Sequence, residues 1–461
     1  MITERIYYET AYCKDFDVLI EEIKEDKEGT WIRLDATAFY PEGGGQPCDT
    51  GNITWNERIS YSSPLKAHRM NVVDVQELGD VIWHRVQPVS EEDDGRRGDR
   101  ECGDRACDDK ERGDKEFGEG KPAWWSRLCE QVREDACGEN DGGQGGWSRK
   151  CGASVPVHGE INWDRRLNLM QQHSGEHMVS GLIHERFGYD NVGFHLSMDT
   201  MTIDLSGDLT WDELMEIEAA ANRLVRENRS IEIDYPSEYE LEHIPYRSKK
   251  ELTGEVRIVT IPGADICACC GTHVSSTGEI GLIKITAMQK WKSGVRVWLC
   301  CGERAENYCR TVQEQNRRIS VALSAKPEET AAAVERVCGE LNQLKQELTG
   351  WKYRYYAEVA KRYEGQRNAV IFEDELSMDD LRHLADKVMD ACPGECFVFS
   401  GRDGAGYRYT VGKRGGDVRG LVKEMNAALS GRGGGKSEMA QGSVQALMAE
   451  IESWVSLHTE H

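Results

Sequence analysis

The chain has 461 residues, and 39% of them are hydrophobic, a content that supports packed cores and excludes a wholly disordered protein. The formal net charge of -24 argues against non-specific nucleic-acid binding, although a local basic patch on an acidic body still permits specific RNA recognition. The sequence has no apolar run of about 18 residues to span a membrane and no pattern of a signal peptide. We therefore expect a cytoplasmic protein whose 16 cysteines are reduced thiols or metal ligands.

Residues 1–90 predict a β-rich, barrel-like subdomain. The alternation of apolar and polar residues in WIRLDATAFY (31–40) and the apolar run VIWHRV (81–86) are both typical of strands. Between them, YPEGGGQPCDTGN (40–52) contains three consecutive glycines and two prolines, which indicate turns and loops.

Residues 91–152 predict a flexible charged insertion. This stretch is rich in charge and glycine, so it offers little apolar surface to offset the entropy of an ordered chain. A short helix around Trp124–Val132 is the one element expected within it.

Residues 153–312 predict an α/β domain that binds zinc. Its first element is one long amphipathic helix in NWDRRLNLMQQHSGEHMVSGLIHERFG (162–188). A strand, an acidic helix and further strands are expected after it, at residues 194–206, 210–229, 255–261, 279–287 and 294–302.

The last part of the chain predicts a helical segment followed by a small domain. In residues 313–365, apolar side chains recur at alternating steps of three and four, the heptad pattern of a coiled coil. The members of this pattern are Val334, Val337, Leu341, Leu344, Leu348, Trp351 and Tyr355. The helix is expected to pair either with another helix of this chain or with a second subunit. Residues 366–461 alternate between strand and helix patterns and predict a small α/β domain, so the fold class is α+β and multidomain.

Two short patterns predict a metal site. His173 and His177 stand four residues apart on the expected helix, so their imidazoles point the same way. Cys269 and His273 flank Gly271 in a turn between strands, and a thiolate with imidazoles suits Zn²⁺. Together they predict a four-ligand shell for one zinc ion per chain. On spacing alone, the neighbouring Cys270 is an alternative thiolate ligand.

Several motifs, in this order, resemble the editing domain of alanyl-tRNA synthetase and its free-standing AlaX relatives. The matching segments are TAFYPEGGGQPCDTG (37–51), HSGEH (173–177), CCGTH (269–273), TGEIGLIKI (277–285) and GVRVWLCCGERA (294–305). In addition, GRGGGKSEMAQG (431–442) resembles the glycine-rich end of the DHH-associated domain, which gives the layout of the long AlaX type. The match selects Cys269 as the thiolate. The chain departs from the usual CGGTH, because Cys270 replaces the first glycine, and the insertion splits the editing module.

The resemblance implies hydrolysis of the ester between a wrong amino acid and tRNA(Ala). Seryl-tRNA(Ala) is the favoured substrate and glycyl-tRNA(Ala) the second, because an alanine pocket excludes neither glycine nor an added hydroxyl strongly. The zinc ion would activate a water, polarise the ester carbonyl or orient the substrate amine. The chain begins at the editing module and has no adenylate-forming motifs, so we do not expect it to act as an aminoacyl-tRNA ligase.

The resemblance also suggests roles for individual residues. The expected catalytic set is His173, His177, Thr37 and Gln46. Thr37 matches a family position near the amino-acid pocket, where its hydroxyl would meet a serine side chain, although it also suits an ordinary strand. Gln46 would hydrogen-bond the substrate or cap its turn. Gly43, Gly44 and Gly45 would let the tRNA terminus approach the backbone, or simply form a tight turn.

Basic residues supply candidate contacts to tRNA phosphates. The main candidates are Arg165, Arg166, Arg432 and Lys436, and the others are Arg247, Lys249, Lys250, Lys290, Lys292, Arg296, Lys413 and Arg414. The expected partner is mischarged tRNA(Ala), with a homodimer through the helical segment or the C-terminal domain as a further expectation.

Two other functions compete with hydrolysis. One is a non-catalytic, zinc-stabilised protein that binds tRNA or assists assembly, in which four closed ligands make the zinc structural. The other is a phosphoesterase, suggested by the usual partner of a DHH-associated domain. The sequence lacks the Asp-His-His triplet and the aspartate-rich dinuclear metal pattern that such an enzyme would need.

Overall fold

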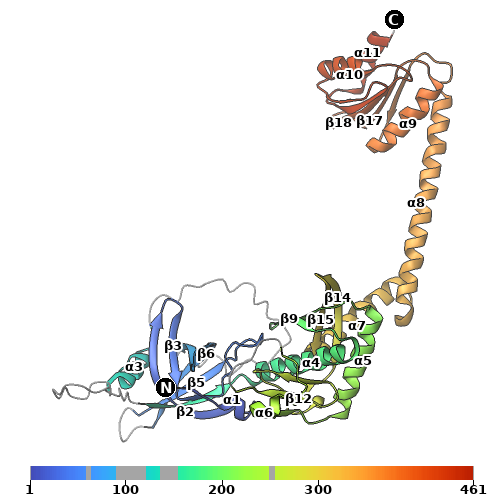
Figure 1. The fold of residues 1–461 in the computed structure, drawn as a ribbon. Coiled ribbons are helices and arrows are strands. Elements are labelled where there is room, and N and C mark those ends of the chain that lie inside the picture. Colours follow the sequence, from blue (N-terminus) through green and yellow to red (C-terminus); the bar gives the residue numbers. More distant parts are fainter. Residues whose placement is uncertain (1, 59–63, 90–120, 135–153, 249–254, 460–461) are drawn as a thin grey trace. The chain divides into compact units, whose positions relative to one another are not determined.

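The computed structural model describes residues 2–58, 64–89, 121–134, 154–248 and 255–459 (Figure 1). The chain forms two compact units, Met1–Gln313 and Glu314–His461. Most of the segment expected to be a flexible insertion lies outside the described residues. In the part of the chain that is described, no helix is both long and apolar enough to cross a membrane.

A closed antiparallel barrel forms the first half of the N-terminal unit, which confirms the barrel-like expectation. Its strands follow the order β2 (Asp15–Asp26), β3 (Gly29–Leu34), β7 (Val81–Pro88), β6 (Lys66–Leu78), β5 (Gly51–Glu57) and β8 (Val155–Ile161). Strand β8 comes from the range expected to open the next domain. It pairs with β2 on one side and β5 on the other, and closure removes both free sheet edges.

Helix α3 (Ala123–Glu134) packs against this barrel and includes the short helix expected near Trp124. Trp124, Trp125 and Leu128 are buried in the same apolar core as the barrel strands. The indole of Trp124 stacks on the imidazole of His68, with ring centroids 4.9 Å apart. At least this part of the insertion therefore belongs to the barrel.

A long helix and a four-stranded sheet form the second half of the N-terminal unit. The helix is α4 (Trp163–Phe187), and the sheet order is β14 (Ile283–Trp291), β15 (Gly294–Cys301), β10 (Met201–Leu205) and β9 (Asn191–Leu196). Helix α5 (Trp211–Glu227) also packs on this core, and β11 (Glu232–Asp234), β12 (Ile258–Ile261) and β13 (Asp265–Ala268) form a separate sheet. The single strand expected over 194–206 is a hairpin, because a polar turn at Ser197–Thr200 reverses the chain between β9 and β10.

Short elements complete the N-terminal unit. The strand β1 (Glu4–Arg5) pairs in parallel with β4 (Ala36–Thr37), and α1 (Ile6–Glu9) follows β1. The helix α6 (Glu238–Leu241) and the 3-10 helix η2 (Thr277–Ile280) lie in connecting segments. Helix α7 (Glu303–Leu323) carries the chain into the C-terminal unit.

The C-terminal unit consists of one long helix and a small α/β domain. After η3 (Pro327–Glu329), helix α8 (Thr330–Lys361) runs for 32 residues. The sheet order is β16 (Ala369–Glu373), β17 (Cys396–Arg402), β18 (Gly406–Gly412), β20 (Met439–Val444) and β19 (Arg432–Gly435), and helices α9 (Met378–Ala391), α10 (Arg419–Ala428) and α11 (Met448–Thr459) cover it. Strands β16 and β17 are parallel and are joined through α9, which agrees with the expected α/β character.

Candidate metal centre

Helix α4 carries a buried row of polar side chains. His173 and His177 are only 1% and 3% exposed, and Gln172, Ser174 and Glu176 beside them are equally inaccessible. Burying polar groups costs free energy unless each finds a partner. This stretch of α4 therefore has a role besides packing.

The loop after β13 brings Cys269 and His273 to the same place. The Arg257 guanidinium donates hydrogen bonds to the carbonyl oxygens of Cys269 (2.7 Å) and Gly271 (2.9 Å), which fixes the loop. Gly271 is required by the close approach of helix and loop. A Cβ at this position would lie 2.1 Å from Cε1 of His173.

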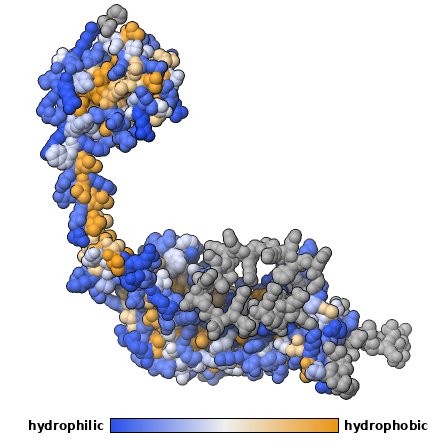
Figure 2. Space-filling view, turned by 180° about the vertical axis from the view of Figure 1, so that it is seen from behind, coloured by the Kyte–Doolittle hydropathy of each residue, from blue (hydrophilic) through white to orange (hydrophobic). Residues whose placement is uncertain are grey.

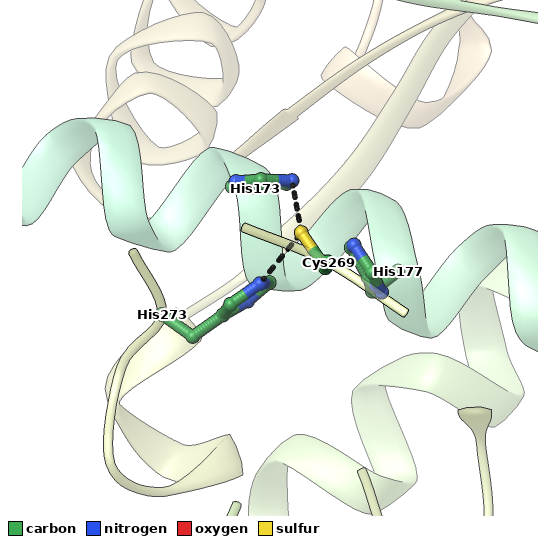
Figure 3. A group of neighbouring side chains, drawn as sticks. All are labelled: His173, His177, Cys269 and His273. Carbon is green, nitrogen blue, oxygen red and sulfur yellow. Dashed lines mark hydrogen bonds between the residues drawn. The ribbon is translucent and has the colours of Figure 1, made fainter. Parts of the chain in front are cut away.

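The four side chains converge on one point (Figure 3). The Cys269 Sγ lies 3.4 Å from the Nε2 atoms of both His173 and His273, and the ligand atoms of all four residues lie within 4.8 Å of one another. Around a tetrahedral zinc ion, with Zn–S about 2.3 Å and Zn–N about 2.0–2.1 Å, sulfur and nitrogen stand roughly 3.5 Å apart. The donor set and its spacing therefore fit Zn²⁺. Cys270 is exposed, and Cys269 is the thiol in the cluster.

Each histidine of the cluster is held from behind through its Nδ1 atom. This atom lies 2.9 Å from the Gln46 Oε1 in His173, 3.0 Å from the Asp265 carboxylate in His177, and 3.0 Å from the Ser174 hydroxyl in His273. Such partners fix the orientation of each ring and leave Nε2 for a metal. Asp265 is in turn held by the guanidinium of Arg247.

The charges in the cluster also suit a metal. Burial opposes ionisation of the Cys269 thiol, but the charges of His173 and His177 outweigh it and hold its pKa well below the usual range. Burial and the neighbouring charge of His173 lower the pKa of His273 to about 3, so its imidazole is neutral. Burial works against a proton on His177, yet the Cys269 charge and the Asp265 hydrogen bond raise its pKa well above the ordinary value. A metal ion would displace that proton as it binds.

Gln46 supports a cluster ligand. Its side-chain amide is buried, accepts from the His173 ring and from the backbone N–H of Thr272 (3.2 Å), and donates to the Thr272 hydroxyl (2.8 Å). The side chain does not cap its own turn in these bonds, and a contact of Gln46 with substrate stays a prediction. The glycine-rich loop of the barrel thus reaches the cluster through this residue.

The three glycines before Gln46 form a tight turn. Backbone hydrogen bonds join Gly43 and Gln46 in both directions, and Gly44 and Gly45 have positive φ angles of 61° and 85°. A Cβ on Gly45 would come 2.8 Å from the ring of Phe194, which stacks on the His173 imidazole with centroids 5.4 Å apart. The three glycines therefore form a structural turn, which also lets Phe194 lie against a cluster histidine, and an approach of the tRNA terminus to this turn stays a prediction.

Thr37 is buried, and its hydrogen-bond partners are residues other than the four ligands. Its hydroxyl lies 2.9 Å from Nε2 of His84 and accepts from the backbone N–H of Phe39 (3.1 Å). Burial lowers the pKa of His84 to about 4, so this imidazole is neutral. Among the described residues, Thr37 has no hydrogen bond to the cluster.

Arg166 requires a correction, because its side chain is 0% exposed and is not available to RNA. Its guanidinium binds the Asp49 carboxylate (Nε to Oδ2 2.9 Å) and donates to the carbonyl oxygens of Ala11 and Ala38. Arg165 also turns inward, where its guanidinium donates to the Cys48 carbonyl oxygen at 2.9 Å. Both arginines tie α4 to the glycine-rich loop.

The remaining basic candidates divide by their surroundings. Arg432 and Lys436 are exposed at the glycine-rich edge strand β19 and the residue after it, and Lys292 is exposed on the N-terminal unit. Ion pairs engage the others that are described, namely Arg247 with Asp265, Lys290 with Asp208, Arg296 with Asp204, Lys413 with Glu395, and Arg414 with Asp386 and Asp390. Lys249 and Lys250 lie outside the described residues.

Apart from Gln46, the sequence did not reveal the residues that support the ligands. Arg247 was a candidate for RNA contact, and Asp265, Arg257 and Ser174 were not among the candidate site residues. Ser174 is the one with a local signal, because it lies inside the HSGEH motif. The others act through contacts between segments distant in the chain, which a single sequence does not display.

Comparison with known proteins gives three family matches. They are "tRNA synthetases class II (A)" over residues 4–99, "Threonyl and Alanyl tRNA synthetase second additional domain" over residues 256–304, and "DHHA1 domain" over residues 365–456. The last two follow one another in the order that the motifs predicted.

Individual relatives fall into two groups. The alanine–tRNA ligase of Pyrococcus abyssi is 29% identical and aligns with 99% of this chain, which spans only 43% of that ligase. The alanyl-tRNA editing protein AlaX-L of Pyrococcus horikoshii is 24% identical, and the alignment covers 98% of this chain and 96% of that protein. Among solved structures, the C-Ala domain of Aquifex aeolicus alanyl-tRNA synthetase is 24% identical over 20% of this chain and 87% of that domain, with a TM-score of 0.18, too low to support an argument.

Proposed function

Because the chain belongs to the alanyl-tRNA synthetase editing-domain family, we propose that it is a zinc-dependent hydrolase that removes wrongly attached amino acids from tRNA(Ala). Serine is the favoured amino acid and glycine the second. One observation carries the proposal: four donor side chains converge, the three histidines among them are buried, and each of these histidines has a hydrogen-bond partner at Nδ1. The match to AlaX-L along nearly the whole of both chains supports the same conclusion.

The residues of the cluster divide the work. His173, His177, Cys269 and His273 would hold the ion, and Gln46, Asp265 and Ser174 keep the three imidazoles aimed at it. When bound, zinc supplies a Lewis acid that lowers the pKa of a water or polarises an ester carbonyl. The ring of Phe194, stacked on His173, places an apolar side chain beside the cluster.

Contacts to the tRNA body are proposed for the C-terminal unit. Arg432, in β19, and Lys436, just after β19, flank the three exposed glycines of this strand. Guanidinium, ammonium and backbone N–H groups together suit phosphate oxygens. The burial of Arg166 and the inward orientation of Arg165 leave this edge as the better candidate.

A second candidate function has the same metal site but no catalysis. All four protein ligands are close together, and a closed four-ligand shell is the usual form of a structural zinc site. In that case the zinc stabilises a protein that binds tRNA without hydrolysing its ester. Catalysis requires that one ligand gives way or that the shell expands.

Deacylation of seryl-tRNA(Ala) by the zinc-loaded full chain tests the proposal. Alanyl-tRNA(Ala) and seryl-tRNA(Ser) are the substrate controls. We expect release of serine from tRNA(Ala) alone, abolished by Cys269→Ala and retained by Cys270→Ala, which removes the exposed neighbouring thiol. No turnover above buffer, with one zinc bound per chain, would refute the hydrolase and favour the binding protein.

A further inference from the structure

An aromatic side chain, Phe194 of β9, lies against the metal centre. Its ring stacks on the His173 imidazole, with centroids 5.4 Å apart and planes 20° apart. The side chains that support the cluster histidines at Nδ1, namely Gln46, Asp265 and Ser174, are polar. A phenyl ring offers no hydrogen-bonding atom to an imidazole, so Phe194 contributes shape and apolar surface at this place.

The glycine-rich turn of the barrel packs closely against the same ring. A Cβ on Gly45 would lie 2.8 Å from Cδ1 and 3.4 Å from Cε1 of Phe194. Gly45 also has a φ angle of 85°, which a residue with a side chain rarely adopts. The phenyl ring therefore contacts a cluster histidine and a turn that approaches it without a side chain, and it has little room to move.

The backbone of β9 fixes the position of Phe194. The side-chain amide of Asn191 donates to the buried Glu176 carboxylate of α4, and its side-chain oxygen accepts from the Gly193 N–H group at 3.1 Å. The register between β9 and β10 shifts at the same place, and such a bulge redirects a side chain. The helix that carries two of the ligands thus also anchors the strand that carries Phe194.

A fixed ring beside the cluster acts on an aminoacyl ester through size. The amino-acid side chain is attached one carbon away from the ester carbonyl, so an ester that reaches the cluster brings its side chain close to the ligands. The hydrogen of glycine and the hydroxymethyl group of serine are small, whereas a branched side chain would have to displace the ring. Overpacking of this kind is unfavourable where the neighbours cannot move apart.

We propose that Phe194 sets the upper size limit of the amino acid that the metal centre accepts, so that side chains larger than that of serine are excluded. This inference rests on the proposed function, because it takes an aminoacyl group on tRNA(Ala) as the ligand. The role expected for Thr37 concerns the serine hydroxyl, whereas the role of Phe194 concerns size. The size limit applies to binding as well as to hydrolysis.

Binding of non-hydrolysable ligands tests the size limit separately from catalysis. The probes are tRNA(Ala) molecules that carry glycine, serine, valine or leucine through a 3′-amide in place of the ester, and the zinc-loaded full chain is titrated with each. The tRNA body is the same in all four, so the ratio of two dissociation constants reports the aminoacyl group. We expect the parent chain to bind the serine probe about 10-fold or more tightly than the valine probe. Phe194→Ala should bring these two affinities together, and Phe194→Leu should give an intermediate ratio.

Phe187 provides a matched control on the same helix as the ligands. Its ring also stacks on an aromatic ring, that of Tyr189, with centroids 5.9 Å apart and planes 16° apart. It lies about 15 Å beyond His177 along α4, at 1.5 Å per residue. Phe187→Ala should therefore keep the serine-to-valine ratio of the parent chain. Mass spectrometry of metal content checks that every variant compared carries about one zinc ion per chain.

Three results would overturn the size limit. They are a parent chain that does not distinguish the serine and valine probes, an unchanged ratio in both Phe194 variants, and an equal loss of affinity for all four probes or a loss of zinc in both variants. The third result would mean that the ring only holds His173 in place. Hydrolysis of the matching seryl ester separates this inference from the proposed function. A chain that binds the probes selectively but hydrolyses no ester would refute the hydrolase and retain the size limit.

Discussion

The metal centre and the middle of helix α8 depart from the usual pattern of burial in opposite ways. Around His173 and His177, polar and ionisable side chains are buried, whereas from Val334 to Tyr355 apolar side chains are exposed (Figure 2). Buried polar groups and contiguous exposed apolar groups both cost free energy in an isolated chain. At the metal centre, a bound ion would relieve that cost.

The largest expected effect is loss of the metal. Cys269→Ser replaces a thiolate with a hydroxyl that does not ionise, so we expect zinc content to fall from about one ion per chain to less than about 0.1. Cys270→Ser should keep its zinc because that thiol is exposed and outside the cluster. Mass spectrometry of metal content in both purified variants decides the matter, and the reverse pattern would assign the thiolate to Cys270.

Arg166→Ala should produce the largest loss of folding stability. It leaves the buried Asp49 carboxylate without its cation, and breaking such a pair from one side costs about 3–5 kcal/mol. Urea unfolding of the N-terminal unit, followed by tryptophan fluorescence in the full chain, measures it. Arg432→Ala, at an exposed position, is the control and should change stability by less than about 0.5 kcal/mol. Equal effects would mean that Arg166 does not support the region behind the metal centre.

Gly271→Ala should displace the His173 side chain, although it changes none of the four ligand residues. The added Cβ would lie 2.1 Å from the His173 ring, which has to move away. We expect zinc affinity to fall by about 100-fold or more, since supporting contacts alone tune affinity by 10–100-fold. Gly339→Ala adds the same methyl group to α8, where nothing lies within 4 Å, and should leave zinc affinity unchanged. Competition with a chromophoric chelator measures both variants.

Gln46→Ala is a milder test, because it removes a hydrogen-bond partner of the His173 ring but none of the four ligands. The ring loses its 2.9 Å partner but keeps its place in α4, so we expect zinc affinity to fall by about 10–100-fold. Gln46→Glu retains an acceptor oxygen for the Nδ1–H group and should lose less than Gln46→Ala. If the two variants lose the same amount, the hydrogen bond does not orient the ring.

The smallest expected effect comes from a substitution on the exposed face of α8. At a protein concentration that keeps the chain monomeric, Leu344→Ala should change the free energy of unfolding by less than about 0.5 kcal/mol, because the side chain is 61% exposed. Leu169→Ala, in the buried core beside the metal centre, should cost about 2–5 kcal/mol. Chemical denaturation compares the two variants. A large loss of stability at Leu344 would mean that this face of α8 is covered within its own chain.

The sequence by itself determined the parts that depend on local spacing. Two histidines one helical turn apart must share a face of α4, so HSGEH sufficed to predict a histidine pair. Alternation and heptads likewise predicted a barrel-like start, a long helix and a closing α/β domain. These patterns are local because they follow from the periods of strand and helix.

Only the tertiary structure decided which distant groups meet. Gln46 reaches His173 across 127 positions of sequence, and Asp265 reaches His177 across 88. Arg166 looked like a surface cation, yet the Asp49 carboxylate, 117 positions away, holds it in the interior. Burial and hydrogen bonding between separate segments depend on how the chain folds back on itself, and residue type and spacing do not encode that in a form that one sequence reveals.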